Sequence, residues 1–363
     1  MRKILILVGL VFAAAITGIF LSKDSWTETD VTAKTTKVGL LLSGNHDDRS
    51  YCQSHYEAIK SLQDDLNLNI ICRENVPNAC YATIVELVQR EGCEIIVGAS
   101  FDYGSDMKKA ANAFQNVYFL HAGGLDRKGN LSTYFGRMYQ ARYLSGIVAG
   151  MESKTGRIGY VAAFPIVQVI RGINAFTLGA RSVRPDAQVY VRYCGSWTED
   201  LPAERESQAL LDNHPIDVLA MHTNSLAPNW VAERRGIYSI GYNWDNRDMF
   251  SDKYLTASAW DWSGYYRQQI LACLTGKFYG SNQWIAMEDG VIKLADYSPQ
   301  VSEQTKEVVR AAQERLRSRE FDVFYGPIRD NQGRLRVEAG EAMSDGAMLN
   351  ALDWYVEGVS VEQ

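Results

Sequence analysis

The sequence predicts a two-lobed α/β protein built on two parallel sheets. Short apolar runs alternate with longer amphipathic segments, and this alternation stops and restarts once along the chain. The 363 residues are 46% hydrophobic and 22% charged, so the chain can bury a large core and is expected to divide into about two domains. Strands that alternate with helices favour parallel pairing, with right-handed crossovers that cover both faces of each sheet.

The first lobe begins with the run KVGLLLS, whose continuous apolar character indicates a buried strand. Amphipathic segments typical of helices then alternate with two further short apolar runs, which gives the order β-α-β-α-β. These five segments are residues 37–43, 54–66, 69–72, 81–92 and 94–100.

The second lobe repeats the pattern after a long predicted helix at residues 138–156. Its first run, RIGYVAAF, has the same strand-then-loop character as KVGLLLSG. The expected strands are residues 157–164, 187–194, 217–223, 237–242 and 254–260, and the expected helices are residues 172–186, 203–214, 229–235, 264–274 and 303–319.

The late elements are expected to cross back between the lobes. The N-terminal lobe would then comprise residues 37–150 with part of 258–320. The C-terminal lobe would comprise residues 151–257 with part of 280–363.

The N-terminus predicts export from the cytoplasm. Arg2 and Lys3 precede an uncharged apolar stretch at residues 4–21. Residues 1–21 therefore suit either a cleaved signal peptide or an uncleaved anchor in the inner membrane. The polar residues 22–36 suit a tether, so we expect the body of the protein in the periplasm or in another extracytoplasmic space.

Export also permits disulfide bonds, and the chain has six cysteines. Three of them, Cys72, Cys80 and Cys93, flank one predicted helix and its adjoining strands and are the first choice for a bridge. Free thiols throughout are the alternative, because spacing alone does not determine connectivity.

The segments that follow the predicted strands indicate a ligand cleft. In open α/β sheets the ligand binds beyond the carboxyl ends of the strands, and two facing lobes turn those ends into a cleft. Aromatic residues gather there, among them Tyr51, Phe101, Trp197, Trp244 and Trp260. Flat apolar faces with a few amide and carboxyl groups favour a flat, mostly neutral ligand with polar edges. For any single ring, packing between the lobes is the alternative.

Sequence signals for cofactors, metals and nucleic acid are weak. The sequence contains no G-x-S-x-G elbow, no P-loop and no G-x-G-x-x-G after a strand. The net charge of -6 is spread along the chain, which argues against nucleic acid. His46 and His55 share one segment, but no ligand pair at helical spacing completes a metal site. We therefore predict no cofactor and no metal.

A nucleoside hydrolase is the enzymatic alternative, because clustered carboxylates can bind a cation or activate water. Asp47, Asp48, Asp102 and Asp245 all fall at strand ends. We favour the interpretation that these residues cap helices or bind the ligand, so the chain is predicted not to be an enzyme.

Several segments resemble a known family. The stretches TYFGRMYQARYLSGIVAG, RIGYVAAFPIVQVIRGINAFTLGARSVRPDAQV, HTNSLAP and GPIRDNQGRLRVEAGEAMSD are similar to the basic membrane protein family of substrate-binding proteins. That family consists of receptors for purine nucleosides and nucleobases that serve ABC importers. The resemblance spans residues 37–359. It implies a type I periplasmic-binding-protein fold, a hinge, ligand capture by closure and a permease partner.

The resemblance also implies how a base would be held. Asp48, Tyr51 and Gln53 match the loop that faces one side of the purine, and Trp197 matches an aromatic that stacks on the other side. Nucleoside-binding members carry an acid and a lysine at positions that correspond here to Asn243 and Trp260. An amide and an indole cannot replace those charges, so a bare nucleobase such as adenine is favoured over a nucleoside.

The predicted function is thus capture of a purine-like base for ABC-type import. The predicted ligand-binding residues are Asp48, Tyr51, Gln53, Ser100, Phe101, Trp197, Asn224, Asn243, Asp245 and Trp260. Arg49, Cys52 and Trp244 depart from the family pattern and leave room for a changed specificity. A membrane-tethered sensory receptor of the same fold is the alternative to an import receptor.

Overall fold

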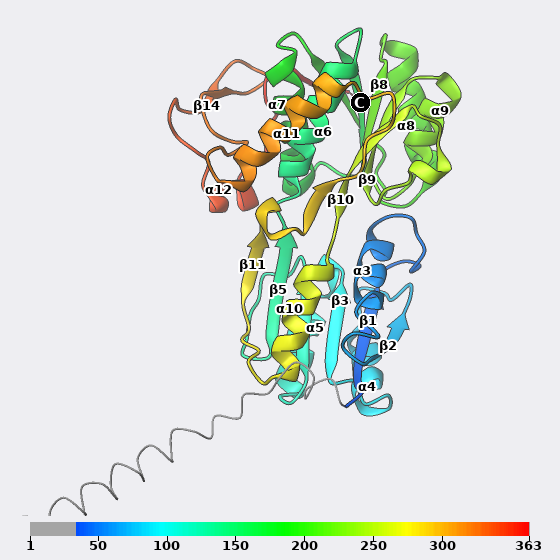
Figure 1. Cartoon of the computed structure of the whole chain (residues 1–363), viewed down its shortest axis with the longest axis vertical. Coiled ribbons are helices and arrows are strands. Elements are labelled where there is room, and N and C mark those ends of the chain that lie inside the picture. The colour runs from blue at the N-terminus through cyan, green and yellow to red at the C-terminus, as the bar shows by residue number, and fades with distance from the viewer. Residues whose placement is uncertain (1–33, 363) are drawn as a thin grey trace, which may run out of the picture.

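The computed structural model describes residues 34–362, and in this range the chain folds into two α/β lobes that follow each other along the long axis of the molecule (Figure 1). The predicted signal peptide or anchor at residues 1–21 lies outside the described residues, as does most of the predicted tether. Among the residues that are described, no helix is both long and apolar enough to cross a membrane.

The first lobe contains a six-stranded sheet with the strand order β11-β5-β4-β3-β1-β2. Every pair in this sheet is parallel. Its elements are β1 (Thr36–Leu42), α3 (Tyr51–Lys60), β2 (Leu68–Arg73), α4 (Tyr81–Gln89), β3 (Ile95–Ala99), η1 (Phe101–Tyr103), α5 (Gly104–Ala113), β4 (Tyr118–Ala122), β5 (Leu131–Gly136), α10 (Ser263–Leu274) and β11 (Asn282–Ile285).

The second lobe contains a seven-stranded sheet with the order β12-β10-β9-β8-β6-β7-β15, in which only β12 is antiparallel to its neighbour. Its elements are α6 (Tyr139–Glu152), β6 (Arg157–Ala162), α7 (Val167–Val183), β7 (Gln188–Tyr193), α8 (Asp200–Asn213), β8 (Val218–His222), α9 (Ala227–Arg235), β9 (Tyr238–Asn243), η2 (Arg247–Met249), β10 (Tyr254–Trp260), η3 (Met287–Asp289), β12 (Ile292–Leu294), α11 (Glu303–Arg317), α12 (Asp345–Asn350) and β15 (Val359–Val361). The strands β13 (Ile328–Arg329) and β14 (Leu335–Val337) form a separate hairpin.

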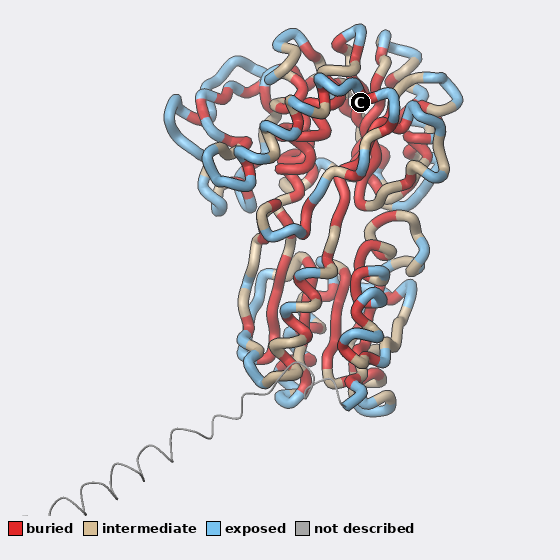
Figure 2. The backbone as a smooth tube through the Cα atoms, in the orientation of Figure 1, coloured by how far each residue is buried: buried red, intermediate tan, exposed pale blue. Residues whose placement is uncertain are grey.

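Burial explains why these segments become strands. The strands of both sheets form the buried interior, while exposed positions lie mainly on helices and loops (Figure 2). In β1, all residues but one are buried. Such runs are apolar throughout because helices cover both faces of a parallel sheet.

The chain crosses between the lobes in three places, from β5 to α6, from β10 to α10 and from β11 to β12 (Figure 1). A side chain at Gly136, where β5 ends, would overlap the ring of Trp260 at the end of β10. Two of the crossings are therefore packed directly against each other. Helix α6 comes after the first crossing and packs on α7 of the second lobe.

The two-lobed α/β architecture predicted from the sequence is confirmed. All six cysteines are free thiols, so the bridge considered among Cys72, Cys80 and Cys93 is not formed. Burial raises the pKa of the Cys80 thiol to about 12 and that of Cys93 to about 11, which keeps both protonated at neutral pH.

Candidate functional site

The turn between β1 and α3 brings the first lobe to the second. Helix α3 begins at Tyr51, three residues before the predicted start, and Asp48 in the preceding turn binds N–H groups of its first turn. One carboxylate oxygen of Asp48 accepts the backbone N–H groups of Ser50 and Gln53, at 2.8 and 2.9 Å, and the other accepts that of Cys52 at 3.0 Å. These bonds supply partners for N–H groups that a helix start leaves free. Asp48 is thus engaged within its own turn.

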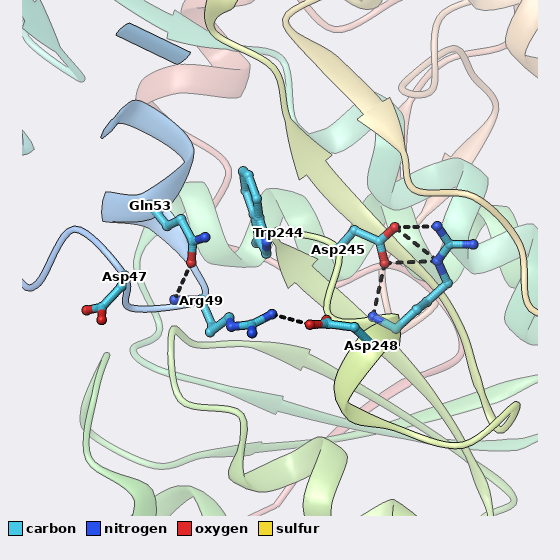
Figure 3. Close-up of a pocket in the computed structure, with 7 residues that line it drawn as sticks. Asp47, Arg49, Gln53, Trp244, Asp245 and Asp248 are labelled. Atoms are coloured by element: carbon cyan, nitrogen blue, oxygen red, sulfur yellow. Dashed lines mark hydrogen bonds and ion pairs between the residues drawn. The ribbon is translucent and has the colours of Figure 1, made fainter. Parts of the chain in front are cut away.

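Three contacts join this turn to the second lobe. The amide Nδ2 of Asn243 donates to the hydroxyl of Ser50 at 2.9 Å, and the amide Nδ2 of Asn246 donates to the carbonyl oxygen of Arg49, also at 2.9 Å. The guanidinium of Arg49 forms an ion pair with Asp248 at 2.7 Å (Figure 3). The lobes therefore meet through polar groups at the amino end of α3.

A cavity of about 550 Å³ opens beside these contacts. The first lobe contributes Asp47, Arg49 and Gln53 to its lining, and the second contributes Trp244, Asp245, Arg247 and Asp248 (Figure 3). Of the predicted ligand-binding residues, only Gln53 and Asp245 line this cavity.

Both of these side chains already have partners within the cavity. The side-chain oxygen of Gln53 accepts the backbone N–H of Arg49 at 3.0 Å, and Asp245 forms an ion pair with Arg247 at 2.8 Å. Trp244 adds an apolar face to this otherwise polar lining (Figure 3). The cavity is thus the polar outer part of the boundary between the lobes.

Asn243 is the centre of the buried contacts between the lobes. Only 1% of its surface is exposed, and its backbone takes the left-handed conformation, with φ +67°. Besides Ser50, its Nδ2 donates to Oδ1 of Asn224 at 2.9 Å, and its Oδ1 accepts from the indole N–H of Trp260 at 2.8 Å. Three of the predicted site residues are therefore brought together in one hydrogen-bonded chain.

The aromatic residues predicted to hold a base lie in two separate groups. In the first group, Tyr51 meets the ring of His55 edge-on, with centroids 4.6 Å apart, and His55 is stacked on Trp262 at 4.8 Å. Trp262 in turn is stacked on Trp260 at 4.6 Å. A continuous aromatic column thus runs from α3 to the hinge strand β10.

Trp197 belongs to the second group, on the other lobe. Its ring centroid lies 6.0 Å from that of Phe164 and 6.3 Å from that of His222. His222 in turn packs against Tyr242 at 4.5 Å. Tyr51 and Trp197 are half-buried and lie on opposite lobes, and each ring contacts an aromatic neighbour within its own lobe.

Ser100 and Phe101 lie at the carboxyl end of β3. The hydroxyl of Ser100 caps η1 by accepting the backbone N–H of Asp102, and its carbonyl oxygen lies 2.8 Å from Nε2 of His121. Phe101 leaves 65% of its surface exposed. Its ring is thus largely exposed to solvent on the first lobe.

Positive charge lies beneath the carboxyl end of β8. Arg142 of α6 is fully buried, donates to the carbonyl oxygen of Met221 at 2.8 Å and stands 3.8 Å from the ring of Tyr242. Burial, together with the nearby Arg142 and Arg171, holds the pKa of His222 well below its ordinary value. His222 is therefore neutral at physiological pH.

His46 and His55, which lie close together in the sequence, bind different partners. His46 pairs with Glu74, and this hydrogen bond raises the pKa of His46. His55 is buried with its Nδ1 2.6 Å from the hydroxyl of Tyr266, and burial lowers its pKa to about 3. Within residues 34–362, no group of three or more His, Cys, Asp or Glu side chains is arranged to hold a metal ion.

Ser50, Asn246 and Asp248 make the contacts between the lobes but were not among the predicted site residues. Their signal in the sequence is position: Ser50 directly precedes Tyr51, and the other two follow within five residues of the end of β9. Cys52, one of the departures from the family pattern, is only 2% exposed, with its sulfur 3.8 Å from the hydroxyl of Ser43. Cys52 thus lies in the core of the first lobe, beside the residues that directly follow β1.

The chain as a whole is similar to known proteins. The chain is 33% identical to a purine-binding protein of Brucella abortus over 326 aligned residues. The alignment covers 89% of this chain and 92% of that protein. It is 35% identical over 269 residues to a protein of Haloferax volcanii described as a candidate ABC transporter glucose-binding protein, which covers 74% of this chain and 66% of that one.

A solved structure shares the fold. An ABC transporter solute-binding protein from Conexibacter woesei superimposes with a TM-score of 0.68 at 20% identity, over 79% of this chain and 98% of that one. The fold is therefore that of the type I periplasmic solute-binding proteins. The family model for PnrA-like ABC transporter substrate-binding proteins matches residues 35–323, and the chain belongs to this family, the basic membrane proteins.

Proposed function

We propose that this protein captures a purine-like base between its two lobes, outside the cytoplasm, and presents the closed form to the permease of an ABC importer. Closure follows if the ligand contacts both lobes, because it then binds the closed state more tightly and shifts the population toward it. The contacts of Ser50, Arg49 and Asn243 across the boundary support such a closed form.

The bond between Trp260 and Asn243 is the observation that carries the choice of a bare base. By the family resemblance, these residues correspond to a lysine and an acid of nucleoside-binding members, and here the indole N–H donates to the amide oxygen at 2.8 Å. An amide and an indole offer no charged pair to ribose hydroxyls. A nucleobase such as adenine, which needs no such pair, is favoured over a nucleoside.

The predicted stacking residues support the same proposal. Tyr51 and Trp197 are half-buried and come from opposite lobes, so a flat ligand that enters between them can contact both. Each aromatic face that stacks on a base contributes about 1 kcal/mol beyond the burial of its area.

A thermal-shift screen tests the proposal, with adenine, hypoxanthine, adenosine and inosine as ligands. A ligand at 100 times its dissociation constant adds about 2.7 kcal/mol of stability and raises the melting temperature. We expect the bases to give larger shifts than the nucleosides. If none of the four shifts the melting temperature, the purine proposal is wrong.

A sugar is the second candidate ligand, because a relative at 35% identity is described as a candidate glucose-binding protein. The charged cavity that carries Trp244 favours this reading, since sugars stack on an indole and bind to carboxylates and guanidinium groups. Glucose in the same screen separates the two candidates. A shift with glucose and none with purines would select the sugar.

A further inference from the structure

The hydrogen-bonded chain from Trp260 to Asn224 has a fixed direction. An indole N–H can only donate, so Asn243 must present its oxygen Oδ1 to Trp260. Its Nδ2 is thereby directed to Ser50 and Asn224, and both protons of that group are used. The orientation of one buried amide thus follows from the identity of its aromatic neighbour.

The same argument extends one residue further. Because Asn243 presents its Nδ2 to Asn224, the group that Asn224 turns toward it must be the acceptor Oδ1. The Nδ2 of Asn224 then points elsewhere, and it donates to no residue among those that the structure describes. Asn224 therefore offers a free N–H donor.

The position of Asn224 makes this donor available to a ligand. Asn224 follows β8 and is half-buried, and its neighbour Asn243 touches Ser50 of the first lobe. Its backbone N–H donates to the carbonyl oxygen of Trp197 at 2.7 Å, so Asn224 lies beside the residue that carries the predicted stacking ring. A base stacked on Trp197 would present its edge to this amide.

The surroundings also favour an electron-rich ligand edge. Arg142 lies beneath the end of β8, and its Nε and Nη2 atoms are buried without a partner. Together with Arg171 it lies close enough to lower the pKa of His222, so the local field is positive. A carbonyl oxygen carries more negative charge than an exocyclic amine and gains more from this field.

We propose that Asn224, oriented by Trp260 through Asn243, selects a purine that presents a carbonyl oxygen, so that a 6-oxopurine such as hypoxanthine binds more tightly than adenine. This inference rests on the proposed purine-binding function and narrows it. Asn224 is the residue that would touch the ligand, while Trp260 and Asn243 are positioning residues. Adenine, favoured by the resemblance as a bare base, would place its 6-amino group against a donor and leave both N–H groups unpaired.

The test compares hypoxanthine with adenine by isothermal titration calorimetry. For the unmodified protein we expect the dissociation constant of hypoxanthine to be at least about tenfold lower, as for the loss of one hydrogen bond with an unpaired donor. In Asn224→Asp, the group facing the ligand becomes an acceptor while the bond from Asn243 is kept. The preference should then reverse in favour of adenine.

Trp260→Phe tests the positioning role. It keeps the aromatic ring but removes the donor that orients Asn243, so both amides can turn and the ratio of the two dissociation constants should fall toward one. A purely structural role of Trp260 would weaken both ligands equally and leave the ratio unchanged, which would overturn the positioning argument.

The outcomes separate the two levels of the proposal. If purines bind the unmodified protein but adenine binds as tightly as hypoxanthine, or if Asn224→Asp leaves the ratio unchanged, the donor assignment is wrong and the purine function stands. If no purine binds at all, the proposed function is wrong, and so is the proposed preference for a 6-oxopurine.

Discussion

The guanidinium of Arg49 reaches across the boundary between the lobes and lies 2.7 Å from a carboxylate oxygen of Asp248. Arg49 holds this position from a left-handed backbone conformation, with φ +54°, which is unfavourable for a residue other than glycine. Its turn is fixed on both sides, because its backbone N–H donates to Gln53 and its carbonyl accepts from Asn246. The strained turn thus places a charged group where it can join the lobes.

Arg49→Ala should shift the ligand-free protein toward the open form. The side chains of Arg49 and Asp248 are 40% and 59% exposed, so the pair contributes about 1 kcal/mol or less and is weakened by salt. That energy corresponds to up to about a fivefold change in the ratio of closed to open molecules. Single-molecule energy transfer between dyes on the two lobes, at low and high salt, measures this ratio.

Arg234→Ala is the matched control, because Arg234 pairs with Glu204 within the second lobe. It should leave the ratio of closed to open molecules unchanged. The double variant in which Arg49 becomes Asp and Asp248 becomes Arg restores the pair and should restore much of the closed population. Equal ratios of closed to open molecules in all four proteins would show that the pair of Arg49 and Asp248 does not stabilise the closed form.

Trp197→Ala should weaken purine binding by about tenfold or more, since it removes a stacking face and the apolar area buried with it. Trp197→Phe should retain most of the affinity, because a smaller flat face remains. Isothermal titration with hypoxanthine measures both. Tyr279→Ala is the control, because Tyr279 is 74% exposed. Binding by Trp197→Ala as tight as by that control would remove Trp197 from the site.

The fold was largely predictable because its strands are apolar runs bounded by turns. The expected strand at residues 254–260 coincides with β10, and the expected helix at residues 303–319 differs from α11 only at its end. The segment that carries α5, β4 and β5 was missed. Its strand LSTYFG is not a continuous apolar run, because the polar residues Ser132 and Thr133 stand in it and are nevertheless buried.

The site was less predictable, because position at a strand end does not tell which way a side chain turns. Asp48 was expected to contact the ligand, but its carboxylate takes three backbone N–H groups of its own turn. Asn243 and Trp260 were each predicted as a separate ligand-binding residue, and only the three-dimensional structure shows that they are hydrogen-bonded to each other. This pairing depends on the register between the neighbouring strands β9 and β10, which sets Asn243 opposite Ala259, next to Trp260.

The buried histidines predict how stability depends on pH. Burial lowers the pKa of His55 to about 3, whereas an unfolded chain binds this proton near pH 6.5. Between about pH 6.5 and pH 3, His55 is protonated in the unfolded state but not in the folded state. The free energy of unfolding therefore decreases as pH falls from about 6.5 toward 3. The slope is about 1.4 kcal/mol per pH unit for such a group, and His222 adds to it in the same direction.

Urea unfolding at pH 7, 6 and 5 measures this slope. His55→Phe should be less sensitive to acid than the unmodified protein, although it loses the bond to Tyr266 and is less stable at pH 7. His46→Gln is the control of opposite sign. The pKa of His46 is raised by Glu74, so its contribution is present below about pH 6.5 and is lost as pH rises through its folded-state pKa. Parallel curves for His55→Phe and the unmodified protein would refute the assignment.

The close crossing of α6 and α7 should make Gly146 intolerant of any side chain. A Cβ atom at Gly146 would overlap the carbonyl oxygen of Phe176, and one at Gly179 would overlap that of Tyr143. Since these contacts are with backbone, the helices themselves must separate, and Gly146→Ala should destabilise the protein by about 2 kcal/mol.

Gly264→Ala in α10 is the control, because nothing lies within 4 Å of its Cβ position and alanine favours the helix by up to about 1 kcal/mol. Urea unfolding of both variants should therefore give changes of opposite sign, and equal changes would mean that the crossing of α6 and α7 adapts to the added methyl group.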